Sequence, residues 1–310
     1  MSKNYEKEYM NKNLLEKTSY FCQTIYNTGK FYCNVVPNLF VKPNEKYSKI
    51  IYPNKSNSYD KIEWNNSSDG LIIVIHGLLG SPKTLGYEIA KKISFINDGE
   101  QYQIKKYYDV ILPIIPFGGN CDLVTASKPL YELILDYIYS TDLTNSFNKS
   151  KKYKSKPIHL ISCSNGCRIA SWIECELRNI NINIKLTCIA GAFGGSIVID
   201  KFDWILGIIL DKNIIKDLAT NSDTNSKLVK KINSELVLGS RDYEFYGTAN
   251  DWYIPNFNDC FPVISKLNLN KNNFTIVYHE LKYGYDHVSL GWYLADEIIS
   301  NSIKWMENVS

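Results

Sequence analysis

The sequence predicts an α/β fold in which helices cover both faces of a mostly parallel central sheet. Short, continuous apolar segments alternate with longer segments of helical periodicity along most of the chain. Continuous apolarity is typical of parallel strands, because such strands are buried on both faces. With 310 residues, of which 45% are hydrophobic, the chain can build the large core that such a sheet needs.

The predicted strands are short apolar runs. They lie, in chain order, at 71–75, 107–112, 158–161, 186–190, 236–238 and 274–278. The first ends at His76-Gly77, and the third runs directly into Ser162. Because segments of helical pattern separate these runs, we expect the strands to pair in parallel.

The predicted helices follow from caps and apolar stripes. Ser81 can cap a helix that has Pro82 in its first turn. Apolar positions at helical spacing indicate further helices at 1–40, 127–139, 166–177 and 288–306.

The domain organisation is predicted from where the alternation of strand and helix patterns begins and where it is interrupted. Residues 1–60 are expected to be a helical and extended segment that packs on, or extends, an α/β domain at 61–310. Within that domain, 193–233 is long for a connection, which predicts an inserted lid. Its apolar block at 204–210 could equally be a lid face that contacts lipid or a buried helix.

Composition narrows the classes of function. The formal net charge is only +3, with no concentrated basic stripe, so a nucleic-acid partner is not expected. The eight cysteines include no CxxC pair, so no metal site is expected. The N-terminal MSKNYEKEYM has no apolar core of a signal peptide, and no apolar run has the length of a membrane span. We therefore expect a cytoplasmic, intracellular location.

The run Ser162-Cys163-Ser164-Asn165-Gly166 has the pattern of a nucleophile turn. A serine hydroxyl needs a base, a group that orients the base, and donors for the oxyanion. A strand that turns sharply into a helix exposes the serine and points the next backbone N–H at the developing charge. The residues two before and two after the nucleophile must be small, and Ser162 and Gly166 meet this requirement.

The run ISCSNGCRIA resembles the nucleophile elbow of the α/β-hydrolases, especially lipases and esterases, and VIHGLLGSP resembles their oxyanion loop. The resemblance covers roughly 70–306 as a pattern of elements. It implies the α/β-hydrolase fold, with Ser164 as nucleophile. It also implies an oxyanion hole formed by the backbone N–H groups of Leu78 and Asn165.

The elbow departs from the family pattern at two positions. Ser162 replaces the usual glycine, which implies some strain or adjustment because serine has a Cβ atom. Cys163 occupies a position that is often His. Cys163 does not fit as the nucleophile, because its flanking positions would be Ile161 and Asn165.

His287 is the candidate base. It lies in a loop just before the last predicted helix, where the family places this residue. His279, at the end of the last strand, is the alternative. His76 belongs to the His-Gly motif and His159 lies within a strand, so both are expected to be structural.

Asp242 is the candidate acid, because it follows the predicted strand at 236–238 and resembles the acid loop of the family. It could also be an ordinary turn residue. The alternatives are Glu244, Asp251 and Asp259. Asp286 is adjacent to His287 and therefore poorly placed to orient its Nδ1 atom.

The resemblance implies a serine hydrolase that cleaves a carboxylic ester, of a lipid or other acyl compound, through an acyl-enzyme and without a cofactor. An amidase, peptidase or thioesterase with the same triad stays open as an alternative. So does a catalytically inactive interaction protein with this fold. Peripheral contact with lipid is compatible with the apolar block, and the oligomeric state is not predicted.

Overall fold

A computed structural model describes residues 12–38, 49–51, 62, 64, 68–97, 108–143, 156–234, 237–262, 264 and 274–309. In these residues, seven strands form one sheet in the order β1-β3-β2-β4-β5-β6-β7. The strands are β1 (Lys49–Ile51), β2 (Gly70–Ile75), β3 (Tyr108–Pro113), β4 (Ile158–Cys163), β5 (Ile184–Ile189), β6 (Arg241–Tyr246) and β7 (Phe274–Tyr278). Every neighbouring pair is parallel, which confirms the predicted fold class.

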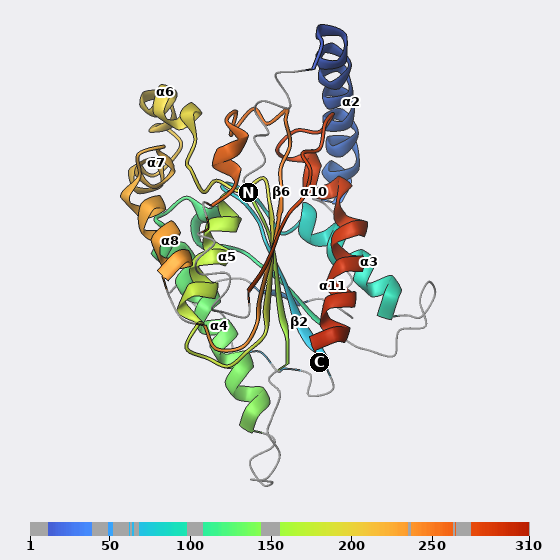
Figure 1. Cartoon of the computed structure of the whole chain (residues 1–310), viewed down its shortest axis with the longest axis vertical. Helices are drawn as coiled ribbons and strands as arrows, with labels where there is room; N and C mark the ends of the chain where they lie inside the picture. Colours follow the sequence, from blue (N-terminus) through green and yellow to red (C-terminus); the bar gives the residue numbers. More distant parts are fainter. Residues whose placement is uncertain are drawn as a thin grey trace.

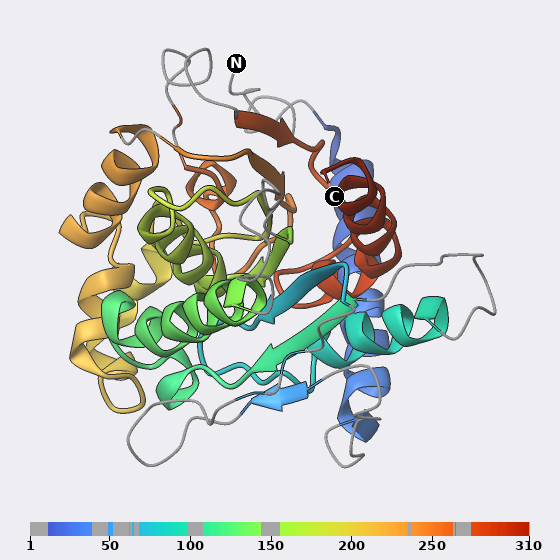
Figure 2. The same cartoon turned by 90° about the horizontal axis from the view of Figure 1, so that it is seen from below.

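Helices cover both faces of the sheet (Figures 1 and 2). One face carries α4 (Leu123–Leu143), α5 (Asn165–Glu176) and α8 (Asp223–Ser234), and the other carries α3 (Leu85–Asn97) and α11 (Ala295–Val309). The last predicted helix is divided, because α10 (Ser289–Tyr293) precedes α11. This three-layer arrangement buries the central strands β2, β4 and β5 from both sides.

Strand β2 shows how the sequence pattern produces these layers. All six of its residues are buried. Leu71 and Ile73 pack in the core beneath α4 and α5, whereas Ile72 and Val74 pack in the core beneath α3 and α11. Successive side chains point to opposite faces of a strand, so a continuous apolar run supplies both cores at once.

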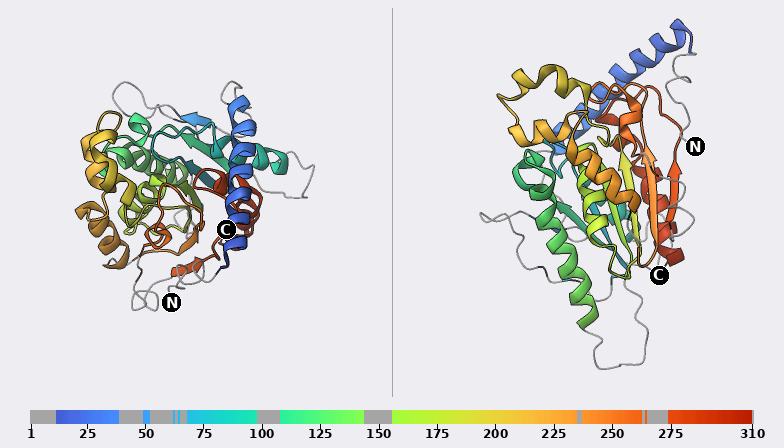
Figure 3. Two further views of the ribbon diagram at one scale, coloured as in Figure 1. Left: turned by 90° about the horizontal axis from the view of Figure 1, so that it is seen from above. Right: turned by 60° about the vertical axis from the view of Figure 1, so that its left-hand side comes forward.

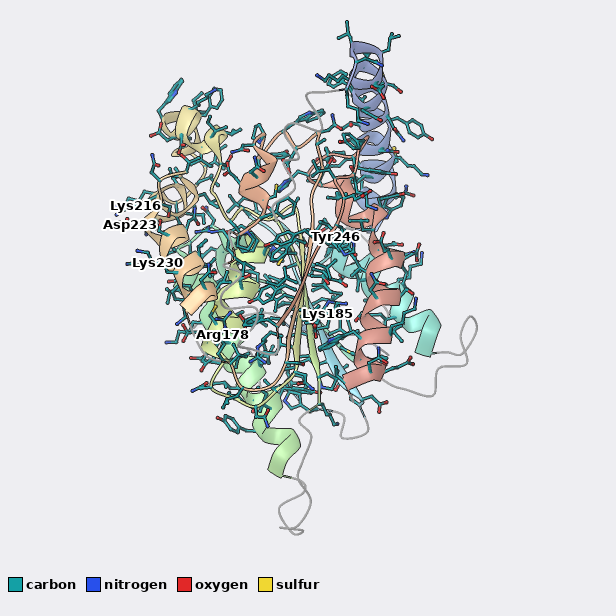
Figure 4. All side chains as sticks on the ribbon, viewed as in Figure 1. Arg178, Lys185, Lys216, Asp223, Lys230 and Tyr246 are labelled. Atoms are coloured by element: carbon teal, nitrogen blue, oxygen red, sulfur yellow. The ribbon has the colours of Figure 1, made fainter. Side chains whose placement is uncertain are left out.

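A buried ionic cluster fixes α5 against the sheet. Glu174 accepts hydrogen bonds from Arg178 and from Arg241, and Tyr243 donates a further bond to it. Burial acts to raise the pKa of Glu174, but the two guanidinium groups lower it below its ordinary value. In Figure 4, Arg178 lies closer to the sheet than Lys216 and Lys230, which lie at the outer edge of the molecule.

The predicted strand at 236–238 is wrong. Of its described residues, Val237 and Leu238 lie in a loop, and the strand β6 begins at Arg241. The β6 sequence RDYEFY alternates instead of being continuously apolar, and Tyr243 and Phe245 carry its buried apolar face. The short β1 at the sheet edge was not predicted either.

The N-terminal segment contains helix α2 (Leu14–Asn38), which packs against α10. The region at 193–233 contains α6 (Ile197–Leu206), α7 (Lys212–Leu218) and α8. Figures 1 and 3 show α2 and α6 projecting at the same end of the sheet, on opposite sides. Among the described residues, no helix has the length and apolarity required to cross a membrane.

Candidate active site

Ser164 lies in the sharp turn between β4 and α5. It directly follows the last residue of β4 and precedes Asn165, the first residue of α5. Its backbone has φ 55° and ψ −130°, and its N–H donates to Ile189 O at 3.0 Å. This is the strained strand–turn–helix geometry that the elbow pattern predicts.

Two glycines allow the chain to approach this turn. A Cβ atom on Gly166 would lie 2.6 Å from His76 O, so the start of α5 packs directly on the backbone after β2. A Cβ atom on Gly77 would lie 2.7 Å from Ser164 Cβ and 3.2 Å from its Oγ. Both positions require glycine, and the His-Gly loop therefore passes directly beside Ser164.

The two departures from the family pattern have physical explanations. Ser162 is buried, and its hydroxyl donates to Thr187 O at 3.1 Å, so its extra atoms are accommodated within the sheet. Desolvation raises the pKa of the Cys163 thiol to about 11, which keeps it protonated at neutral pH. A protonated thiol is a poor nucleophile, which agrees with the preference for Ser164.

Backbone strain is concentrated at one edge of the sheet. Among the described residues other than glycine, φ is positive at Leu79, Phe117, Ser164 and Ala190. These residues follow β2, β3, β4 and β5, which are four consecutive strands of the sheet, in the order β3-β2-β4-β5. Each such conformation costs about 1–3 kcal/mol, and this kind of strain clusters at functional sites. The carboxyl edge of the sheet is therefore the candidate active-site edge.

His76 holds two loops together at this edge. Ile115 N–H donates to its Nε2 at 3.1 Å, so Nε2 carries no proton. The proton is then on Nδ1, which donates to Gly77 O at 2.8 Å. Burial lowers the pKa of His76, consistent with this neutral form. His76 thus has the structural role that the sequence predicts.

The structure brings the two predicted oxyanion-hole residues close to Ser164. Leu78 follows Gly77, and its N–H has no acceptor among the described residues, whereas the Leu79 N–H donates to Gly118 O. Asn165 is the first residue of α5, so no preceding helical turn accepts its N–H. Neither backbone N–H group therefore has a hydrogen-bond acceptor among the described residues.

His287 pairs with Asp251. The Nδ1 atom of His287 lies 2.6 Å from Asp251 Oδ2, and both side chains are buried. The other carboxylate oxygen of Asp251 accepts from the backbone N–H groups of Tyr253 and Ile254, at 2.9 and 2.8 Å. Since a carboxylate only accepts, Nδ1 carries a proton, and in the neutral imidazole Nε2 is an acceptor.

Two buried polar residues join the loops that carry this pair. Thr248 Oγ1 contacts the carbonyl oxygens of Lys282 and Tyr285, at 3.0 and 2.6 Å. Asn250 Oδ1 accepts from Gly284 N at 3.3 Å. The loop after β6 and the loop after β7 are therefore linked just before Asp251 and just before His287 along the chain. Such contacts hold an acid and a base in register.

Asp242 is not the partner of His287, which corrects the prediction. It lies near the amino end of β6, and its Oδ2 accepts from Trp305 Nε1 at 2.5 Å. In the sheet register, Asp242 is level with Lys185 and His159. His159 lies roughly 16 Å before Ser164 along β4. Asp242, at the same level of the sheet, is therefore far from the edge where Ser164 lies. The error follows from the strand predicted at 236–238.

The other candidate residues have structural partners. His279 stacks on Tyr246, with ring centroids 3.9 Å apart, and desolvation lowers its pKa. Glu244 pairs with Lys185 at 2.8 Å. Asp286 accepts from Ser289 N at 2.8 Å at the start of α10. Asp259 forms a hydrogen bond with the Asn256 side chain, and desolvation raises its pKa.

Three parallel strands each lead into one of the residues of interest: β4 into Ser164, β6 into the loop of Asp251, and β7 into the loop of His287. The carboxyl ends of these strands share one edge of the sheet. Cys163, beside Ser164, and Tyr285, two residues before His287, pack against the same apolar cluster, which includes Ile189 and Leu290. Among the described residues, Ser164 Oγ and His287 Nε2 form no hydrogen bond with each other. The structure therefore pairs His287 with Asp251 and makes no hydrogen bond between this pair and Ser164.

Throughout the described ranges, no group of three or more His, Cys, Asp or Glu side chains could hold a metal ion.

Comparisons with known proteins agree with this fold. No protein-family model matches the chain, and no curated protein matches its sequence significantly. Among solved structures, an esterase from Pyrobaculum calidifontis matches with a TM-score of 0.50 and 13% identity, over 91% of this chain and 91% of that chain. The chain therefore has the α/β-hydrolase fold.

Two further structural matches are weaker. A fungal esterase from Rhizomucor miehei matches with a TM-score of 0.47 and 13% identity, over 84% of this chain and 81% of that chain. Phospholipase PlaB from Legionella pneumophila matches with a TM-score of 0.40 and 14% identity, over 57% of this chain. The matched part is 39% of the phospholipase chain.

Proposed function

We propose that this protein is a serine hydrolase that cleaves carboxylic esters through an acyl-enzyme on Ser164. The observation that carries the proposal is the His287–Asp251 pair, which lies at the same sheet edge as the strained Ser164. Similarity in fold to esterases supports an ester substrate, by analogy.

In the proposed reaction, Ser164 Oγ attacks the ester carbonyl carbon while His287 Nε2 takes the hydroxyl proton. Asp251 holds the imidazole by its Nδ1–H and stabilises the imidazolium that forms. The backbone N–H groups of Leu78 and Asn165 donate to the oxyanion. His287 then gives its proton to the departing alcohol oxygen, and a water molecule hydrolyses the acyl-enzyme by the same steps. Ser164 and His287 must approach to about 3 Å for these transfers.

Exposed apolar side chains near the proposed site favour an apolar acyl group. Leu79 is 57% exposed and Phe117 is 65% exposed, on the two loops that His76 joins. Leu78 packs against the small core that α6 and α7 share with Ile254. The region at 193–233 thus contacts both the oxyanion loop and the acid loop, as a lid over this site would.

Within that region, α6 is the part that we propose as a lid. Trp204 is 73% exposed and Ile208, just after α6, is 83% exposed. In contrast, the side chain of Asp217 in α7 binds Leu123 N and Thr224 Oγ1, which fixes the following segment to the domain.

Labelling with a fluorophosphonate probe tests the proposal. We expect the wild-type protein to be labelled and the Ser164→Ala variant to be unlabelled, because the probe reacts only with an activated serine. The Cys163→Ser variant is the matched control at the adjacent position and should be labelled like the wild type. An unlabelled wild-type protein, or a labelled Ser164→Ala variant, contradicts the proposal.

Rates of hydrolysis then identify the substrate class. We expect p-nitrophenyl esters of increasing chain length to be cleaved faster than matched amides. Faster cleavage of the amides or of acyl thioesters would instead support the peptidase, amidase or thioesterase alternative.

A further inference from the structure

The side chain of Asn165, directly after Ser164, is held in one orientation by a buried cation. Asn165 is 2% exposed, and its Oδ1 accepts from Arg168 Nη1 at 2.9 Å. A guanidinium can only donate hydrogen bonds, so the amide oxygen must face Arg168. The amide nitrogen, Nδ2, must then point to the other side.

That other side is the oxyanion loop. A Cβ atom on Gly119 would lie 3.7 Å from Asn165 Nδ2 and 3.7 Å from Leu78 Cα. Asn165 Nδ2 therefore lies near the backbone whose N–H we propose as an oxyanion donor. In the described part of the chain, Nδ2 has no hydrogen-bond acceptor. An N–H group without a protein acceptor at this place is available to a carbonyl oxygen.

Arg168 is buried and, within the ranges that the structure describes, makes no direct contact with a carboxylate. It is 0% exposed, its Nη2 donates to the backbone oxygen of Asp217 at 2.9 Å, and its Nε has no partner among these residues. The Asp217 carboxylate is already bound by Leu123 N and Thr224 Oγ1. Desolvation lowers the pKa of Arg168 to about 10, although Asp217 opposes this shift. The guanidinium thus remains charged at neutral pH.

A cation at this position is unfavourable for the folded protein alone. It lies in the first turn of α5, where the helix dipole already places partial positive charge. Its burial also carries a desolvation cost. An oxyanion beside Ser164 would be stabilised by the same charge. A hydrogen bond from a guanidinium also polarises the amide that accepts it, which strengthens that amide as a donor.

We propose that the Asn165 side-chain N–H is a third donor to the oxyanion, and that Arg168 is the positioning residue that holds this amide. The two backbone N–H groups are the other donors. This proposal rests on the proposed function, because it needs an oxyanion formed by attack of Ser164.

The Asn165→Asp variant separates a catalytic from a structural role. An aspartate still accepts from Arg168 and adds a counter-charge, so the melting temperature should be retained or raised. It has no N–H to donate and carries negative charge, so kcat for a p-nitrophenyl ester should fall by about 100-fold or more with little change in KM. Asn34→Asp, at an exposed position of α2, is the matched control and should keep the wild-type kcat.

The role of Arg168 is tested by a double-mutant cycle. We expect Arg168→Met and Asn165→Ala each to lower kcat, and the double variant to lose little more than either single one, because the residues act as a unit. Multiplicative losses would overturn the positioning role. Wild-type kcat in Asn165→Asp would overturn the third donor while ester hydrolysis stands. A wild-type protein without fluorophosphonate labelling would overturn the proposed function and this proposal with it.

Discussion

At the scale of single residues, the partner of His287 determines which imidazole nitrogen can accept a proton. In the Asp251→Asn variant, an amide N–H can face Nδ1, which favours the tautomer with the proton on Nε2. We expect kcat to fall by about 10⁴-fold, the loss typical of this substitution in a catalytic triad. The melting temperature should change little, because the amide oxygen can still accept from Tyr253 and Ile254 N–H.

Asp242→Asn is the matched control for this measurement. Trp305 Nε1 can still donate to the amide oxygen at this position, so kcat should stay close to the wild-type value. If Asp242→Asn lowers kcat as strongly as Asp251→Asn, the assignment of Asp251 is wrong.

The sequence pattern predicts the turn at Ser164, whose surroundings are local, but offers Asp251 only as an alternative to Asp242 as the partner of His287. The turn at Ser164 is defined by its neighbours at 162 and 166 and by one nearby loop, so its pattern is visible in the chain. Asp251 instead contacts His287, which lies 36 positions later in the sequence. The long connection between them contains several other acidic residues. Only the folding of that connection, held by Thr248 and Asn250, selects one of them.

At the scale of whole elements, the same contrast holds for the strands. The buried strand β2 was predicted because it has helices on both sides and is therefore apolar throughout. Strand β6 was missed because only one of its faces is apolar: Asp242 and Glu244 alternate with Tyr243 and Phe245. The polar side chains of β6 pair with Lys185 of β5 and with Trp305 of α11. The sequence pattern does not show these contacts.

Helix α2 is an element whose contacts suggest a role in the proposed site. Asn27 Nδ2 donates to Gly284 O at 2.6 Å, and Tyr20 stacks on Tyr283 at 4.8 Å. Both contacts lie on the loop that carries His287. We therefore expect Asn27→Ala to lower the free energy of unfolding by about 1 kcal/mol, the typical value of one hydrogen bond, and to lower kcat. Faster amide hydrogen exchange at 282–287 would report the loosened loop directly.

Asn34→Ala is the control within the same helix. Asn34 is exposed, and its Nδ2 donates to Lys30 O of α2 itself, so its loss should leave the loop unchanged. Equal hydrogen exchange at 282–287 in wild type and in Asn27→Ala would show that α2 does not hold the loop.

At the scale of the whole molecule, histidines couple folding to pH. Burial lowers the pKa of His76, of His159 and of His279 below the ordinary value of 6.5. His159 lies between the sheet and α11, with Nδ1 2.6 Å from Ser302 Oγ and Nε2 2.8 Å from Thr187 Oγ1. Each of these residues is therefore neutral in the folded protein at a pH where the unfolded chain begins to bind protons.

The sign of the effect follows from proton binding in the two states. Below pH 6.5 the unfolded chain binds more protons than the folded protein, so the free energy of unfolding falls as pH falls. Each histidine contributes at most about 1.4 kcal/mol per pH unit. Urea unfolding between pH 7.5 and 5.5 should show this loss, and His159→Gln should reduce its slope because glutamine does not titrate. A free energy of unfolding that is constant or rises toward pH 5.5 would contradict the coupling, and an unchanged slope in His159→Gln would exclude His159 as one of its sources.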